Sequence, residues 1–356
     1  MQELFYLPRD GDGRMTAREI IKQSLDHKGT AVTPYTAAFE QDIHKRLGEY
    51  YGDSGWEQKK LRQFMCCHLY ADTVRMRQID DVYSTDGYGA LWRMDRVPWH
   101  LEKPPLPEPK INGAAFPKAD DFVAGIKEQK KSAIAAFEAD GEHYRMISMG
   151  WGIFEHSWRM RGFENALTDM HLEEKFYAEL TERLTDIFIE MLKACEDVPA
   201  DAVLFGDDWG DQRGVIMGAQ RWRKFLKPCW KRIYAETHRQ GKKTLQHSCG
   251  GISEIYGDLI EIGLDCHESA QPEPAGMATE QIKKRWGGEL SFWGCLGSQS
   301  VLHDKSPEEI KKAVFFLRDL FRNDGGFILA PAKPLFNETP IEKAAAFVEA
   351  LTEINL

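Results

Sequence analysis

The stretch Leu245-Gln246-His247-Ser248-Cys249-Gly250-Gly251 decides the fold of this chain. An apolar run ends in a histidine, a cysteine follows two residues later, and two glycines precede a helical pattern that starts near Ile252. This arrangement is typical of a buried parallel strand that turns into a helix, where α/β proteins usually carry their chemistry. Residues i and i+2 of a strand share a face, so His247 and Cys249 are expected to point together. The pair favours a soft divalent metal, zinc first, and a packed or hydrogen-bonded pair is the alternative.

The same strand-then-helix pattern recurs along the chain. Strands are expected at Ala31–Pro34, Asp81–Thr85, Tyr144–Ser148, Ala202–Phe205, Thr244–His247, Leu264–Cys266, Leu290–Trp293 and Gly326–Leu329. Helices are expected near residues 119–138, 153–170, 173–195, 219–240, 252–262, 278–286, 307–322 and 341–353. Such alternation predicts parallel strands. Eight units favour a closed (β/α)8 TIM barrel, with an open doubly wound sheet as the alternative.

The N-terminal part and one insertion stand apart from these units. Residues 1–14 are expected to be a leader, and residues 15–356 a single barrel domain. A capping box from Thr16 to Glu19 opens an N-terminal helical extension, and further helices are expected at 36–51 and 57–78. A small hairpin is expected at 88–94, and the proline-rich residues 97–118 are expected to form an irregular surface excursion.

Composition excludes several classes of function. The chain has 356 residues, 42% of them hydrophobic, and a net charge of −10 with scattered basic residues, so nucleic-acid binding is not expected. No apolar run approaches the ~18 residues of a membrane span, and residues 1–14 lack the apolar core of a signal peptide. The odd count of seven cysteines does not indicate a disulfide framework. We expect a cytoplasmic protein, and no dinucleotide or P-loop fingerprint follows a strand.

In a barrel, the residues that follow the strands line one mouth. The residues expected there are Pro34, Tyr35, Trp151, Glu155, Asp207, Asp208, Gln212, His247, Cys249, His267, Glu268, Gln271, Cys295 and Lys333. Three cysteines, at 249, 266 and 295, fall near the ends of neighbouring strands, which strengthens the expectation of a metal. Each residue also has a structural interpretation: Cys266 packs in the barrel wall, the Asp207-Asp208 pair caps a turn or a helix, and Lys333 is exposed.

Several motifs together resemble the uroporphyrinogen decarboxylase superfamily, over a span from about Met15 to the C-terminus. They are Phe154-Glu155-His156, Arg161-Gly162-Phe163-Glu164-Asn165, Phe205-Gly206-Asp207-Asp208-Trp209-Gly210, His247-Ser248-Cys249-Gly250, Gly263-Leu264-Asp265 leading to Gln271-Pro272-Glu273, Phe292-Trp293-Gly294, and Gly325-Gly326-Phe327-Ile328-Leu329-Ala330-Pro331. The resemblance implies a (β/α)8 barrel, in agreement with the independent strand count.

The superfamily contains two main chemistries. The decarboxylases carry an arginine-rich segment after the first strand, and the matching stretch here, residues 33–39, has no arginine. The other branch contains corrinoid-dependent methyltransferases, including methylcobamide:coenzyme M methyltransferases and methyl ether demethylases. Those that activate thiols hold zinc with a His-x-Cys after the fifth strand, which His247 and Cys249 match, and with a cysteine after the eighth. Residues 330–334 contain no cysteine. The third ligand is then Cys295, Cys266 or Glu268, or the site is metal-free.

The resemblance therefore implies a methyltransferase that works between a small substrate, with aromatic methyl ethers among the candidates, and a corrinoid on a partner protein. The chain itself lacks the Asp-x-His-x-x-Gly corrinoid motif. We expect zinc on His247 and Cys249 to polarise the leaving oxygen, and Asp208 or Glu268 to protonate it. The residues expected to bind substrate are Tyr35, Trp151, Glu155, Asp207, Gln271 and Lys333.

Two alternatives remain open. The first is a decarboxylase or lyase that acts on a small carboxylic or porphyrinogen-like acid, with the Asp207-Asp208 pair stabilising a developing cation and Lys333 holding a carboxylate. The second is a metal- or corrinoid-binding accessory protein without catalysis.

Overall fold

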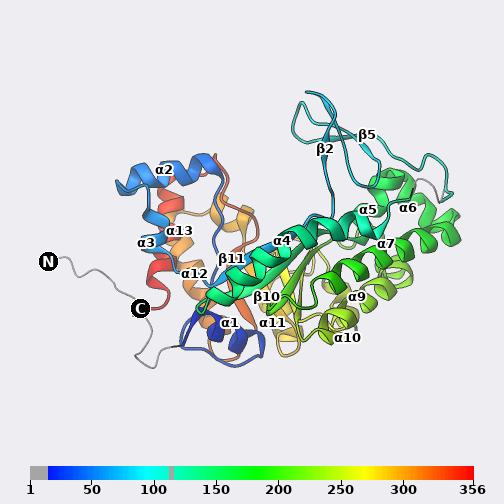
Figure 1. Ribbon diagram of the computed structural model, residues 1–356. Coiled ribbons are helices and arrows are strands. Elements are labelled where there is room, and N and C mark those ends of the chain that lie inside the picture. The colour runs from blue at the N-terminus through cyan, green and yellow to red at the C-terminus, as the bar shows by residue number, and fades with distance from the viewer. Residues whose placement is uncertain (1–14, 112–115) are drawn as a thin grey trace.

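A curled sheet of parallel strands forms the centre of the molecule (Figure 1). A computed structural model describes residues 15–111 and 116–356 of the chain. The strands, in spatial order, are β1 (Met65–Ala71), β6 (Tyr144–Trp151), β7 (Ala202–Gly206), β8 (Lys243–His247), β9 (Cys266–Ala270), β10 (Ser291–Leu296) and β11 (Phe327–Pro331). The fold is a TIM-barrel-like α/β fold, as predicted. β11 is all buried and β10 likewise, as expected of strands that are covered on both faces.

The first predicted barrel strand is reduced to a single bridge. Tyr35 pairs in parallel with Leu329 of β11, the Thr36 amide donates to the Leu329 carbonyl at 2.9 Å, and the Leu329 amide donates to the Pro34 carbonyl at 2.9 Å. The strand expected at 31–34 is therefore replaced by a bridge at Tyr35, one residue later in the chain. It nevertheless continues the sheet beyond β11, in the position of the first barrel strand.

The second barrel strand was predicted in the wrong place. Residues 57–78 were expected to be helical, but they contain only the short helix α3 (Trp56–Lys60), followed by β1. β1 pairs with β6 along most of its length, and this long-range pairing overrides the helix-like local pattern. The segment Asp81–Thr85, expected in the barrel, lies instead in a separate antiparallel sheet.

This separate sheet, the excursion sheet, rises from the end of β1 at the top of Figure 1. Its strands are β2 (Arg77–Gln78), β3 (Tyr83–Thr85), β4 (Leu91–Arg93) and β5 (His100–Lys103). The hairpin expected at 88–94, after the Asp86-Gly87 turn, is not formed as predicted: β4 pairs with β3 across that turn. The excursion predicted at 97–118 is irregular among its described residues except for β5.

Helices cover the outside of the barrel sheet. They are α1 (Ala17–Leu25), α2 (Gln41–Tyr51), α4 (Ala119–Ala139), α5 (Ile153–Arg161), α6 (Phe163–Leu172), α7 (Glu174–Ala194), α8 (Ala219–Arg221), α9 (Lys227–Arg239), α10 (Tyr256–Glu261), α11 (Thr279–Trp286), α12 (Pro307–Phe321) and α13 (Ile341–Glu353). The single helix expected at 153–170 is split at Gly162, whose φ of 87° favours glycine. The capping box of Thr16 and Glu19 is present at α1.

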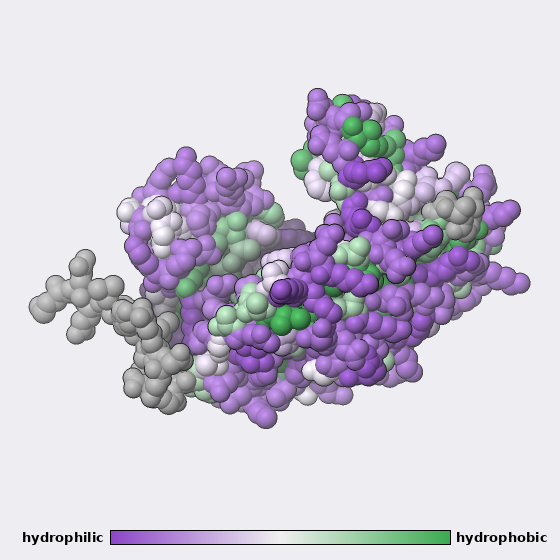
Figure 2. Space-filling view, viewed as in Figure 1, coloured by the Kyte–Doolittle hydropathy of each residue, from purple (hydrophilic) through white to green (hydrophobic). Residues whose placement is uncertain are grey.

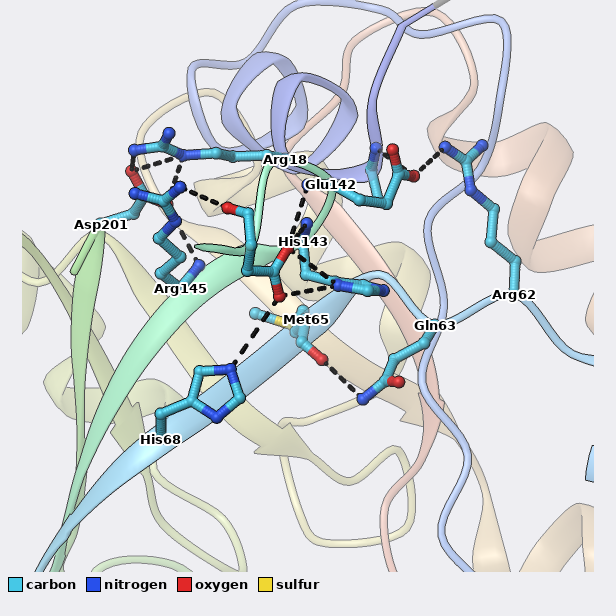
Figure 3. A network of polar contacts seen from close by, with 11 residues as sticks. Arg18, Arg62, Gln63, Met65, His68, Glu142, His143, Arg145 and Asp201 are labelled. Carbon is cyan, nitrogen blue, oxygen red and sulfur yellow. Dashed lines mark hydrogen bonds and ion pairs between the residues drawn. The ribbon is translucent and has the colours of Figure 1, made fainter. Parts of the chain in front are cut away.

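A polar network closes the amino-terminal end of the barrel (Figure 3). Arg18 of α1 donates three hydrogen bonds of 2.8, 2.9 and 3.2 Å to the Asp201 carboxylate, and Arg62 donates to Glu142 at 2.8 Å. These contacts tie α1 and the chain before β1 to the loops that precede β6 and β7. In barrels of this type, contacts at this end serve stability rather than chemistry.

The leader predicted at 1–14 lies outside the described residues. No helix within 15–111 and 116–356 combines the length and the apolar character that crossing a bilayer requires.

Candidate active site

The loops after β7 and β8 meet backbone to backbone at the carboxyl end of the barrel. A Cβ atom on Gly250, whose φ is 79°, would lie 2.3 Å from the Gly210 carbonyl carbon, so only glycine allows this approach. The Trp209 amide donates to Ser248 Oγ at 3.0 Å, and the Cys249 amide donates to Asp208 Oδ1 at 2.7 Å. The two loops therefore hold Asp208 beside Cys249.

Asp208, His247 and Cys249 form a compact donor group, with one ligand atom from each within 4.8 Å of the other two. His247 Nε2 lies 3.3 Å from Cys249 Sγ and 3.5 Å from Asp208 Oδ1. Its other ring nitrogen, Nδ1, lies 2.5 Å from Glu268 Oε2. A carboxylate on the far nitrogen is the usual arrangement that orients a metal-ligating histidine. The donor set therefore fits a zinc ion.

Lys333 joins this group from the loop after β11. Its Nζ lies 2.7 Å from Cys249 Sγ, and its amide donates to Ser298 Oγ at 2.9 Å. Burial opposes the charge, but the hydrogen bond to Cys249 and the carboxylates of Asp208 and Glu268 raise the pKa of Lys333. Lys333 therefore places a positive charge directly against the sulfur atom of Cys249.

His247 titrates under the same influences. Burial alone would lower its pKa, but the Glu268 carboxylate and the contact with Cys249 raise it well above the ordinary value.

Glu155 and Asp207 form a buried acidic pair beside this group. Asp207 accepts hydrogen bonds from the Phe154 and Glu155 amides at 3.0 Å and from the indoles of Trp209 and Trp230. These donors favour its carboxylate, although burial raises its pKa. Burial, followed by the charges of Asp207 and Asp208, raises the pKa of Glu155 to about 8. Of the two, Glu155 is therefore the group that keeps its proton near neutral pH.

The other residues expected to bind substrate divide into two kinds. Trp151, the last residue of β6, is 40% exposed at the mouth. Tyr35 is buried in the wall, where its hydroxyl accepts from the Arg62 amide at 2.9 Å. Gln271 Oε1 accepts from the Gly250 amide at 2.8 Å, so this side chain positions the Cys249 loop. Asp207 likewise holds the start of α5.

Cys295 is not brought to the donor group, contrary to its predicted role as a metal ligand. It lies within β10, and positive φ angles at Gly294 (134°) and Cys295 (66°) accompany a register shift that turns its side chain outward. There the thiol contacts Thr279 of α11, and burial raises its pKa to about 12. Cys266, the second candidate, is fully buried. Asp208, predicted to be an acid, takes the third position among the donors instead.

Two further residues, Arg159 of α5 and Trp99 of the excursion, were not predicted from the sequence. Arg159 is 3% exposed, and its Cζ lies 3.6 Å from the centre of the Trp151 ring. The sequence offered one signal for Arg159: it lies one helical turn after Glu155, so both side chains share a face of the helix that follows β6. Nothing local in the sequence brings Trp99 to the same place.

The comparisons with known proteins agree with this architecture. The family model described as uroporphyrinogen decarboxylase (URO-D) matches residues 122–354. Uroporphyrinogen decarboxylases from Bacillus cereus strain B4264 and from Bacillus anthracis are each 33% identical over 105 residues, or 30% of this chain. The match spans only 29% of the length of those two relatives.

Among solved structures, a methyltransferase from Methanosarcina mazei superposes with a TM-score of 0.65 at 14% identity. The superposition covers 96% of this chain and all of that one. At this level of identity the likeness shows the fold alone.

Proposed function

The chain belongs to the uroporphyrinogen decarboxylase family, and we propose that it is a methyltransferase that works between a small methyl-bearing substrate and a corrinoid on a partner protein. The observation that carries this proposal is the donor group of Asp208, His247 and Cys249 at the barrel mouth, with Glu268 orienting His247. The arginine-free segment 33–39 argues against a porphyrinogen that carries many carboxylates. The methyltransferase from Methanosarcina mazei is a precedent for a methyltransferase on the same fold.

Asp208, His247 and Cys249 would hold zinc, which when bound supplies a Lewis acid for the leaving atom of the substrate. Glu268 keeps the Nε2 atom of His247 directed at the other two donors. The Lys333 ammonium, from the loop after β11, lies against the sulfur atom of Cys249. The zinc ion held by these residues would place positive charge where the leaving oxygen or sulfur of a methyl ether or thioether gains electrons.

Glu155 is the residue that we propose as the proton donor to the leaving group. It retains a proton near neutral pH, and it lies at the start of α5 beside Asp207 and within the field of Asp208 and His247. A general acid works best when its pKa is close to the working pH. This role replaces the predicted role of Glu155 in binding, and it leaves Asp208 and Glu268 to hold and orient the donor group.

The open mouth suits a docking partner that delivers the corrinoid. Figure 2 shows the surface hollowed between the lobe around α2 and α13 and the excursion sheet. We propose that the partner approaches along this hollow.

The test is methyl transfer from a panel of ethers and thioethers to cob(I)alamin, followed by the visible spectrum of the corrinoid. The zinc content of the purified protein is measured in parallel. We expect transfer and close to one zinc per chain, both lost in His247→Ala. A wild type that is active without zinc would contradict the metal assignment, and no transfer across the panel would contradict the reaction class.

A decarboxylase is the second candidate, and one specific observation favours it. The mouth contains two cations, Lys333 and Arg159, which can hold a carboxylate. Release of carbon dioxide from a small acid in the absence of any corrinoid would identify this reaction.

A further inference from the structure

A cavity lies between the excursion sheet and the end of β6. Its volume is about 250 Å³, and its lining combines apolar side chains with one cation and one acid: Asp72, Val74, Met76, Trp99, Trp151 and Arg159. A cavity of about 150 Å³ is already large enough to take a benzene molecule. The space therefore suits a single substituted aromatic ring.

Arg159 brings to this cavity a positive charge that no acid among the described residues pairs with. Its side chain is 3% exposed, and its Nε and Nη1 atoms find no hydrogen-bond partner within 15–111 and 116–356. Its guanidinium stacks at 3.6 Å on the Trp151 ring and lies 5.0 Å from the Trp92 ring. Stacking uses the flat face of the guanidinium and leaves its in-plane N–H groups free, the edge that recognises a carboxylate with two hydrogen bonds.

The acids near Arg159 are engaged elsewhere or neutral. Asp86 accepts from the Tyr88 and Ala90 amides and from the Trp92 indole. Glu155 keeps its proton near neutral pH. Asp72, the acid of the lining, uses Oδ1 to accept the Val74 and Arg75 amides, which caps its own loop. A buried cation without a counter-charge is costly, so a ligand that brings an anion is favoured.

We propose that this cavity binds a single-ring aromatic carboxylate, with the carboxylate on Arg159 and the ring between Trp99 and Trp151. Trp99 reaches the cavity from the chain just before β5 and is 54% exposed, so it forms the outer wall. Figure 2 shows hydrophobic side chains on the surface of the excursion sheet, where Ile79 and Val97 are exposed. Tryptophan walls and a guanidinium end select a flat body with a planar anion.

The role of this ligand as methyl donor rests on the proposed function, whereas its binding does not. A methoxylated aromatic acid would be anchored by its acid end at Arg159.

Binding is tested on the full chain by calorimetry with benzoate and with benzyl alcohol, a neutral molecule of the same shape. We expect wild type to bind benzoate at least tenfold more tightly than the alcohol. Arg159→Met should weaken benzoate binding about tenfold to a hundredfold and leave the alcohol unchanged, because charge-assisted hydrogen bonds are lost. Arg213→Met, on an exposed side chain outside the cavity, should change neither.

Trp99→Ala supplies a second variant in case Arg159→Met does not fold. It removes an exposed wall residue, so thermal unfolding without ligand should be unchanged while benzoate binding weakens severalfold. Equal binding of benzoate and benzyl alcohol, no benzoate binding, or benzoate binding unchanged in both variants overturns the proposal.

The same samples separate this inference from the proposed function. Benzoate binding without methyl transfer from 4-methoxybenzoate to cob(I)alamin supports the cavity and argues against that substrate role. Methyl transfer from neutral ethers that benzoate does not inhibit overturns the cavity as the substrate anchor.

Discussion

The two ends of the barrel carry groups of the same composition and opposite character. At the amino-terminal end, Cys66, His68 and Asp140 place one ligand atom each within 4.8 Å of one another, as Asp208, His247 and Cys249 do at the carboxyl end. By residue type and spacing alone, each can hold a metal. The two groups differ in what surrounds the cysteine sulfur and the aspartate carboxylate.

At the amino-terminal end, hydrogen bonds already occupy the Asp140 carboxylate, and the Cys66 thiol keeps its proton. Burial and the neighbouring Asp140 raise the pKa of Cys66 to about 12. Burial alone would raise the pKa of Asp140, but hydrogen bonds from the backbone and ring of His143, from the Cys66 thiol and from the Glu142 amide lower it to about 2. At the carboxyl end, Lys333 contacts the sulfur and Glu268 directs the imidazole. The charge around the cysteine therefore marks the reactive end.

The largest effect is expected for the cysteines themselves. Cys249→Ala removes a ligand and the partner of Lys333, so zinc affinity and methyl transfer should each fall at least about a hundredfold, more than for loss of an outer-shell partner. Cys66→Ala should keep zinc and activity, because a neutral thiol is no ligand. Zinc content by mass spectrometry and the corrinoid assay measure both. Zinc lost from Cys66→Ala and kept in Cys249→Ala would reverse the assignment of the two ends.

The carboxylates should show the next effect. Glu268→Gln weakens the orientation of His247, and zinc affinity should fall about tenfold to a hundredfold. Asp140→Asn is the matched change at the other end, where it removes acceptors for the 140–143 turn. It should lower the free energy of unfolding by about 1–3 kcal/mol and leave zinc affinity unchanged. Competition with a chelator and urea unfolding measure the two quantities. A drop in zinc affinity for Asp140→Asn alone would contradict the comparison.

The carboxyl end of the barrel could be predicted because the strongest local signals in the sequence lie there. The apolar run, the His-x-Cys and the glycine pair located β8 and its turn, and the capping box from Thr16 to Glu19 located the start of α1. β1 was missed because residues 57–78 carry no glycine or proline to separate the strand from the helix before it. Only its pairing with β6 makes it a strand.

The composition of the donor group depended on geometry that local patterns do not carry. Cys295 faces outward because of positive φ angles at two successive residues, which no periodicity predicts. Lys333 and Cys249 are 84 residues apart and meet only when the barrel forms. In the sequence, Arg159 does not differ from any other arginine on a helix. Only the folded chain shows that no described residue accepts a hydrogen bond from its Nε and Nη1 atoms.

A change in pH should affect stability in opposite directions through the titratable groups at the two ends of the barrel. The folded pKa of Glu155 is about 8, above its ordinary value of 4.5, so between these values the native chain holds a proton that the unfolded chain releases. Stability therefore falls as pH rises through this window, by up to about 1.4 kcal/mol per pH unit. Asp140, with a lowered pKa, contributes stability that is lost only as pH falls below about 4 toward 2. Glu155→Gln should flatten the slope between pH 5 and 8, measured by urea unfolding. A slope that Glu155→Gln leaves unchanged would place the proton elsewhere.

The smallest effect is expected at Lys333, and its sign decides what the lysine does. The ammonium and a metal ion would compete for the same sulfur of Cys249, so Lys333→Met should tighten zinc binding. The gain should stay below about tenfold, because the thiolate also loses a stabilising charge. Lys242→Met is the control: this lysine is buried, whereas Lys333 is half-buried, and it lies just before β8, at the amino-terminal end, where it donates to the Glu196 carbonyl. It should leave zinc affinity unchanged. Weaker zinc binding in Lys333→Met would instead make the lysine a supporter of the metal site.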